Sequence, residues 1–253
     1  MFWFKPKLTI DVQAKERVEL ALQWLLHEFG EEYFLRQQMV LPEDSFFPDQ
    51  LDTDESVKKL IACVCLSMGV NFESVEIRIF TDRDNFASIY GVDVSEIKQD
   101  TTDVCFPATP QCKMQIAIHA NELKRPMVLV GTIAHELGHA ILSGAGKILA
   151  KPDSYEFLTE VLITFLGLGA CIRNSAFAFD QWQDHNPPGW RASHLSEETF
   201  AYALAACAWM KNDKAEWSRH LSMKIGHHFK SSLNYLNKGG ATALEKLRTP
   251  GDT

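Results

Sequence analysis

The spacing of apolar residues over the first half of the chain predicts two helices followed by two strands. Apolar positions recur at helical spacing over residues 12–29 and 54–68, and a glycine ends each segment. Apolar and polar positions then alternate over residues 75–80 and 114–119, which is the pattern of half-buried strands. Residues 81–112 show little periodicity, and we expect a loop there of a length that is often functional.

The second half of the chain is predicted to be helical. Pro126 stands at a first helical position, where its missing N–H does no harm. Helical spacing predicts four helices, at residues 126–142, 154–171, 197–210 and 214–236. Two strands among so many helices place the chain in the α+β class, mostly helical.

Composition narrows the class of protein. The chain has 253 residues, of which 46% are hydrophobic and 23% charged, and this length can bury a substantial core. The net charge is −8 and the basic residues are scattered, so we expect no nucleic-acid partner. No apolar stretch reaches the roughly 18 residues of a membrane span, and the first residues lack a secretory signal. We therefore expect a cytoplasmic protein without a membrane span.

The six cysteines are expected to be reduced thiols, because no export signal precedes them. Cys63 and Cys65 form a C-x-C pair, and Cys105 and Cys112 form a C-x6-C pair. Neither pair has the C-x2-C spacing of zinc knuckles, so the sequence gives a cysteine zinc site weak support.

The chemically informative segment is H-E-x-x-H, within residues 132–141. His135 and His139 are four residues apart, so on a helix they project about 40° apart and can bind one metal ion. Glu136 lies beside them, where it can take a proton from water that the metal activates. The alternative is a core helix whose histidines only form hydrogen bonds. The uncharged flanks and the predicted helix favour the metal site.

A third metal ligand is expected on the following helix. A catalytic zinc ion takes three protein ligands and a water molecule. Glu156 and Glu160 share one face at the start of an otherwise apolar segment, and a carboxylate entering a buried helix needs a partner. Alternatively, both carboxylates only complement the helix dipole near an exposed end.

Together these two segments resemble the gluzincin pattern of zinc metallopeptidases, in which H-E-x-x-H is followed on the next helix by E-x-x-x-D. The resemblance implies that His135, His139 and Glu156 bind Zn²⁺ and that Glu136 is the general base. Glu160 stands where the pattern has Asp, which implies that it orients a histidine ligand. Its arm is one methylene longer, so Glu160 is also an alternative third ligand.

The resemblance also sets the expected architecture, a zincin-like core made of a small sheet, the H-E-x-x-H helix and the third-ligand helix. We expect one domain over residues 1–253, with N-terminal helices over 1–70, the zincin-like core over 71–175 and C-terminal helices over 176–253. The chain is also similar in layout to a family of bacterial proteins that share an L-P-x-x-x-F-F-P-D-like stretch, here residues 41–49, and the Phe-Leu-Gly-Leu-Gly run of residues 165–169. That similarity implies no substrate.

Two further features extend the expected site. Zincins have a strand beside the active helix that pairs with extended peptide, and residues 114–119 stand at the corresponding place in the order of elements. Transition-state stabilisation needs a hydrogen-bond donor, and the candidates are Tyr202, His185 and His194. Each of these three is more readily explained as a structural or surface residue.

The sequence therefore predicts a zinc metallopeptidase that acts on a peptide or protein substrate. Glu136 would activate water and then protonate the leaving amine. The alternative is a non-proteolytic zinc-binding or interaction protein that keeps a zincin scaffold and uses zinc to tie two helices together. The intact Glu136 favours the enzyme, because a structural zinc has no use for a base. A fourth protein ligand, from Glu160 or a cysteine of residues 81–112, would favour the alternative.

Overall fold

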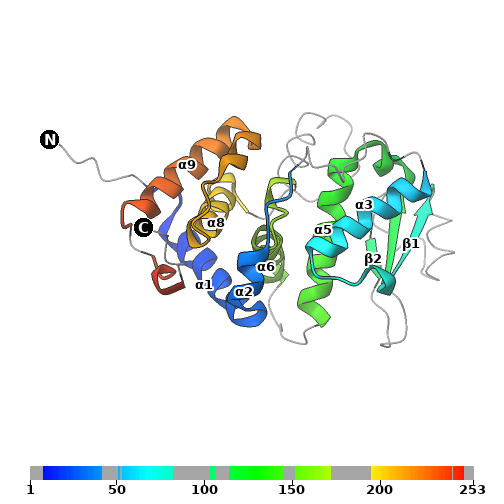
Figure 1. The fold of residues 1–253 in the computed structure, drawn as a ribbon, viewed down its shortest axis with the longest axis horizontal. Coiled ribbons are helices and arrows are strands. Elements are labelled where there is room, and N and C mark those ends of the chain that lie inside the picture. Colours follow the sequence, from blue (N-terminus) through cyan, green and yellow to red (C-terminus); the bar gives the residue numbers. More distant parts are fainter. Residues whose placement is uncertain are drawn as a thin grey trace. The chain divides into compact units, whose positions relative to one another are not determined.

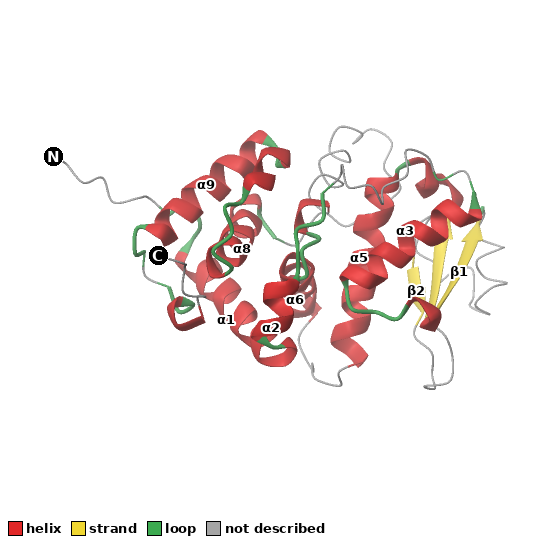
Figure 2. Cartoon of the chain, in the orientation of Figure 1, coloured by secondary structure: helices red, strands yellow, loops and turns green. Residues whose placement is uncertain are grey.

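The computed structural model describes residues 8–41, 51, 53–81, 103–105, 114–144, 152–171, 195–240 and 242–247. This part of the chain is mostly helical (Figure 2). The chain divides into two compact units, one made of Met1–Leu41, Lys151–Ala170 and Ser193–Thr253, the other of Pro42–Ala150 and Cys171–Ala192. We call them the helical unit and the sheet unit. The single domain expected from the sequence stays a prediction.

The helical unit is built around one buried helix. Its helices are α1 (Val12–Phe29), α2 (Glu31–Arg36), α6 (Pro152–Phe165), α8 (Glu197–Met210) and α9 (Met223–Asn237). Every residue of α8 from Thr199 to Met210 is buried, and α8 packs against α1, α6 and α9 (Figure 1). Alanine makes up much of α8, so the neighbouring helices can approach its backbone on several sides. The core of this unit therefore surrounds α8.

The sheet unit combines a three-stranded sheet with two long helices. Its elements are α3 (Asp54–Ser67), β1 (Val75–Phe80), β2 (Asp103–Cys105), β3 (Met114–His119) and α5 (Pro126–Gly144). The strand order is β1-β3-β2, with β3 parallel to β1 and antiparallel to β2. Ile116 and Ile118 of β3 are fully buried, and α5 packs against α3 and β2. The central strand thus leads directly towards the helix that carries H-E-x-x-H.

Most of the predicted elements are confirmed at their predicted residues. The helices α1, α3, α5 and α8 and the strands β1 and β3 begin and end within about two residues of the predicted bounds. Local capping explains this agreement, since Asp11 accepts a hydrogen bond from the Ala14 amide at the start of α1. The Ser196 hydroxyl accepts one from the Thr199 amide at the start of α8.

Two predicted helices have the wrong bounds. The helix predicted over residues 154–171 ends at Phe165, because Gly167 takes a φ of +88° and the Leu168 amide bonds back to the Ile163 carbonyl. The helix predicted over residues 214–236 begins only at Met223, where Ser222 caps it. A 3-10 helix over Glu216–His220 precedes it.

Residues 114–119 were expected to be the strand that pairs with extended peptide, and the sheet contradicts this expectation. These residues form β3, the central strand, which pairs with β1 along its whole length. On its other side, Gln115–Ala117 pairs with β2. The backbone groups of β3 are therefore used within the sheet, and β1 and β2 flank it on either side.

Several expectations concern residues outside the described ranges. They include residues 42–49 of the Pro-rich stretch, Cys112, most of the segment 81–112, and the candidate donors His185 and His194. Among the described residues, no helix is long and apolar enough to cross a membrane.

Candidate metal centre

The apolar residues of α5 are buried on one face of the helix, and this leaves its polar side chains partly exposed on another face. Leu129, Val130, Ile133 and Leu137 are fully buried. His135, Glu136 and His139 are only partly buried. At 100° per residue, this distribution follows from the spacing of apolar positions in the sequence. The H-E-x-x-H segment thus lies on a helix as predicted, with its three candidate side chains partly exposed.

The two histidines converge on one point. Their Nε2 atoms lie 2.9 Å apart, so one ring N–H donates to the other nitrogen. The ring centroids are 4.5 Å apart, and the ring planes are nearly perpendicular at 83°. Two nitrogens aimed at the same space are what a shared metal ion requires, and the i, i+4 spacing provides this arrangement without further adjustment.

Glu156 of α6 completes a group of three side chains that could hold a metal ion. One nitrogen from each of His135 and His139 and a carboxylate oxygen of Glu156 all lie within 4.8 Å of one another. All three residues are partly buried. Two imidazole nitrogens and one carboxylate oxygen suit zinc and other transition metals. All three members of this group are residues that the sequence analysis named as candidate metal ligands.

Glu160 occupies a different environment from Glu156. Its side chain is 5% exposed, and its Oε2 accepts a hydrogen bond from the Leu195 amide at 3.3 Å. Glu160, on α6, therefore contacts the segment just before α8, within the helical unit. The His135–His139–Glu156 group, which could hold a metal ion, does not include it, and the choice between Glu156 and Glu160 as third ligand stays a prediction. The part that Glu160 plays towards the histidines stays a prediction.

Tyr202 lies in the core of the helical unit. It is fully buried on α8, and its hydroxyl donates to Glu19 Oε1 of α1 at 2.6 Å. Burial and the neighbouring Glu19 carboxylate both raise the pKa of Tyr202. This contact accounts for the hydroxyl as a structural group, and we do not include Tyr202 in the proposed site.

Cys63, Cys65 and Cys207 are free thiols with raised pKa values. Cys65 and Cys207 are buried, and burial raises the pKa of Cys65 to about 11 and that of Cys207 to about 12. Burial also raises the pKa of Cys63. Thiols with raised pKa values stay protonated near neutral pH and bind metal poorly. These cysteines are best explained as packing residues.

Comparisons of the chain with models of protein families, with curated proteins and with solved structures found no match. The functional argument therefore depends on the residues of the site itself. Its strongest element is the group on α5, where sequence motif, helix and side-chain geometry agree. The carboxylate from α6 adds the third donor.

Proposed function

We propose that this protein is a zinc-dependent hydrolase that cleaves peptide bonds. One observation carries the proposal: the ligand atoms of His135, His139 and Glu156 lie within 4.8 Å of one another, with Glu136 next to the first histidine. A purely structural site would explain the two histidines and Glu156. It would not explain a carboxylate in the position of a general base.

The donor set matches a catalytic zinc site more closely than a structural one. Structural zinc sites usually have four protein ligands, whereas catalytic sites have three and keep one position open. Two histidines and one glutamate provide three ligands. A bound zinc ion would supply Lewis acidity, which polarises a carbonyl and makes water more acidic.

The chain's own residues supply the proton transfer. Glu136 accepts the proton of the attacking water at its carboxylate and then donates it to the leaving amine nitrogen. This requires that Glu136 can reach solvent and substrate, and its side chain is partly exposed. The buried Ile133 and Leu137 anchor α5 in the core, and this anchoring fixes the positions of His135 and His139.

The proposal is tested by measuring metal content and peptide cleavage with the same preparations. We expect one zinc ion per chain by elemental analysis, lost in His139→Ala and retained in Glu136→Gln. Cleavage of a mixed peptide library should fall by at least ~100-fold in Glu136→Gln, because general-base catalysis contributes roughly 10²–10⁴-fold. His227→Ala is the matched control, since this histidine is exposed on α9.

Three outcomes are informative. Zinc binding and cleavage that both depend on His139, with cleavage that also depends on Glu136, support the proposal. A chain that takes up no zinc on titration contradicts it completely. A chain that binds zinc through His139 but cleaves nothing contradicts the hydrolase and leaves the non-proteolytic zinc-binding protein.

A further inference from the structure

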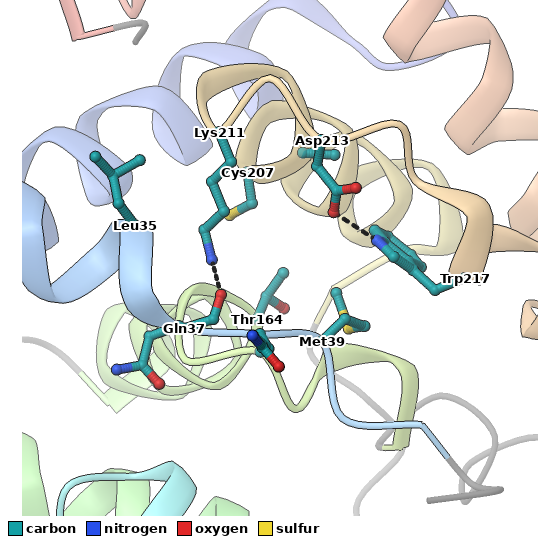
Figure 3. Close-up of a pocket in the computed structure, with 11 residues that line it drawn as sticks. Leu35, Gln37, Met39, Thr164, Cys207, Lys211, Asp213 and Trp217 are labelled. Atoms are coloured by element: carbon teal, nitrogen blue, oxygen red, sulfur yellow. Dashed lines mark hydrogen bonds between the residues drawn. The ribbon is translucent and has the colours of Figure 1, made fainter.

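The helical unit contains a pocket that shares no residue with the proposed metal group. Its volume is about 270 Å³. The residues that form its walls come from the end of α2, the segment after it, the end of α6 and the end of α8 with the turn that follows; among them are Leu35, Met39, Thr164, Cys207, Lys211 and Trp217 (Figure 3). Ligand pockets for drug-sized molecules measure roughly 300–1,000 Å³, so this pocket suits a smaller molecule.

Lys211 gives the pocket a positive charge. Its Nζ donates to the Gln37 carbonyl oxygen at 2.6 Å and lies 4.4 Å from the centroid of the Phe34 ring. Burial lowers the pKa of Lys211. Within the described ranges, no carboxylate lies within 4.0 Å of this ammonium group. An ammonium group has three N–H donors, and its carbonyl partner is neutral, so the group favours an added anion.

Asp213, the carboxylate nearest in sequence, attracts Lys211 electrostatically and partly offsets the effect of burial on its pKa, but its two oxygens accept hydrogen bonds from other groups. Asp213 Oδ2 accepts from the Trp217 indole N–H at 2.8 Å, and its Oδ1 accepts from the Ala215 amide at 2.7 Å. Figure 3 shows the Asp213 carboxylate turned towards Trp217, while the Lys211 side chain extends towards Gln37. The Trp217 ring also packs against Phe229, with the ring centroids 5.2 Å apart. These two contacts hold the Trp217 side chain in place at the edge of the pocket.

Apart from Lys211 and Asp213, the lining residues are uncharged, and they include both polar and apolar side chains. Leu35 and Met39 contribute hydrocarbon and thioether surface. Burial raises the pKa of Cys207 to about 12, so its thiol is protonated near neutral pH and acts as a small apolar group. The pocket therefore combines one cation, one carboxylate whose oxygens already accept hydrogen bonds, neutral polar groups and an apolar surface of limited extent.

We propose that this pocket binds a small organic monocarboxylate with an apolar body. The carboxylate pairs with Lys211, and the hydrocarbon part lies against Met39 and Trp217. Neither a polyanion nor a long chain fits, because the pocket offers a single cation and a volume of about 270 Å³.

The test compares two probes of the same shape on the full chain after removal of metal with EDTA, so that a carboxylate cannot bind through zinc. The probes are 3-phenylpropanoate and the neutral 3-phenylpropanamide, titrated by calorimetry. We expect the carboxylate to bind at least ~10-fold more tightly, because hydrogen bonds to a charged group are the strong ones. Lys211→Met should lose at least ~10-fold in affinity for the carboxylate, and Lys211→Arg should restore most of it.

Lys214→Met is the control, because Lys214 is an exposed lysine three residues from Lys211. Its affinity for 3-phenylpropanoate should equal that of the unchanged chain. The proposal is overturned if both probes bind equally, if neither binds, or if Lys211→Met binds the carboxylate as well as the unchanged chain does. Should Lys211→Met fail to fold, the comparison of the two probes on the unchanged chain decides alone.

Discussion

At the scale of single residues, Glu19 shows how this chain accommodates a buried charge. The side chain is 2% exposed on α1. Its carboxylate accepts hydrogen bonds from Lys15 at 2.8 Å, from the hydroxyls of Tyr202 and Thr242 at 2.6 Å each, and from the Ala243 amide at 3.1 Å. Burial alone would raise the pKa of Glu19, but these four donors outweigh burial and lower it. The carboxylate thereby joins α1, α8 and the C-terminal segment.

Replacing this carboxylate should cost stability in a pH-dependent way. We expect Glu19→Gln to lower the free energy of unfolding by about 2–4 kcal/mol at pH 7, because it weakens several charge-assisted hydrogen bonds in the core. Since folding lowers the pKa of Glu19 below its ordinary value of 4.5, its contribution is complete above that pH and disappears as the pH falls through the folded-state pKa. Urea unfolding of both chains from pH 7 to pH 3 measures this.

The exposed Glu16, also on α1, supplies the control. The stability difference between the unchanged chain and Glu16→Gln should be small throughout this range of pH. The difference caused by Glu19→Gln should shrink below pH 4.5; a difference that stays constant would show that Glu19 acts through packing and not through its charge.

The choice between Glu156 and Glu160 is also a question about single residues. We expect Glu156→Gln to weaken zinc binding by more than ~100-fold and Glu160→Gln to weaken it less, because partners outside the ligand set typically contribute 10–100-fold. A zinc titration against a chromogenic chelator gives both affinities. If Glu160→Gln loses zinc while Glu156→Gln keeps it, the proposed ligand set is wrong.

At the scale of elements, the sequence predicted those helices and strands that are determined by nearby residues, through regular apolar spacing and capping. The helices α1 and α8 combine a regular apolar spacing with a capping residue, and both were predictable. The six-residue α2 follows Gly30 directly and is too short for a periodic pattern. The three-residue β2 exists by pairing with β3, a partner that the local pattern of residues 81–112 does not reveal.

The end of α6 is another feature that local sequence does not reveal. Gly167 has a φ of +88°, and a Cβ added there would lie 2.1 Å from the Gln38 carbonyl oxygen. The Val40 amide donates to the Gly167 carbonyl at 2.9 Å. Gly169 is similarly close to a side chain, with a Cβ placed 2.9 Å from Leu204 Cδ2. The Phe-Leu-Gly-Leu-Gly run therefore has a structural explanation in close packing against segments distant in sequence.

A pair of glycine substitutions separates backbone strain from this packing. Gly30 has nearly the same φ, +86°, with no atom within 4 Å of an added Cβ. Gly30→Ala should cost only the backbone strain, about 1–3 kcal/mol, because its φ of +86° and ψ of 149° suit glycine almost alone. Gly167→Ala should cost a further ~1–3 kcal/mol from the clash. Urea unfolding measures both, and equal losses would mean that Gln38 moves away without penalty.

At the scale of the whole molecule, the two parts of the candidate site differ in how well the sequence could predict them. The H-E-x-x-H group lies within one turn of α5, so a helix fixes its geometry regardless of the rest of the fold. The proposed third ligand belongs to another helix, and spacing within α6 alone could not distinguish Glu156 from Glu160. The same limit applies to the grouping of the chain, since the helical unit combines three segments that are separated in the sequence.

If the proposed ligands from α5 and α6 bind one metal ion, metal binding should stabilise the folded chain. A ligand that binds only the native state adds about 2.7 kcal/mol at a free concentration of 100 times its Kd, and for a chain of this size that raises the Tm by roughly 5–10 °C. We expect this rise when zinc is returned to EDTA-treated protein, measured by thermal unfolding followed with circular dichroism. His227→Ala should show the same rise. His139→Ala should show no such rise. The same variant also reports zinc binding to the six cysteines and the other histidines of the unfolded chain, which would lower the Tm. An equal rise in His139→Ala would mean that zinc stabilises the chain elsewhere, and the group on α5 would then lose its role as the metal site.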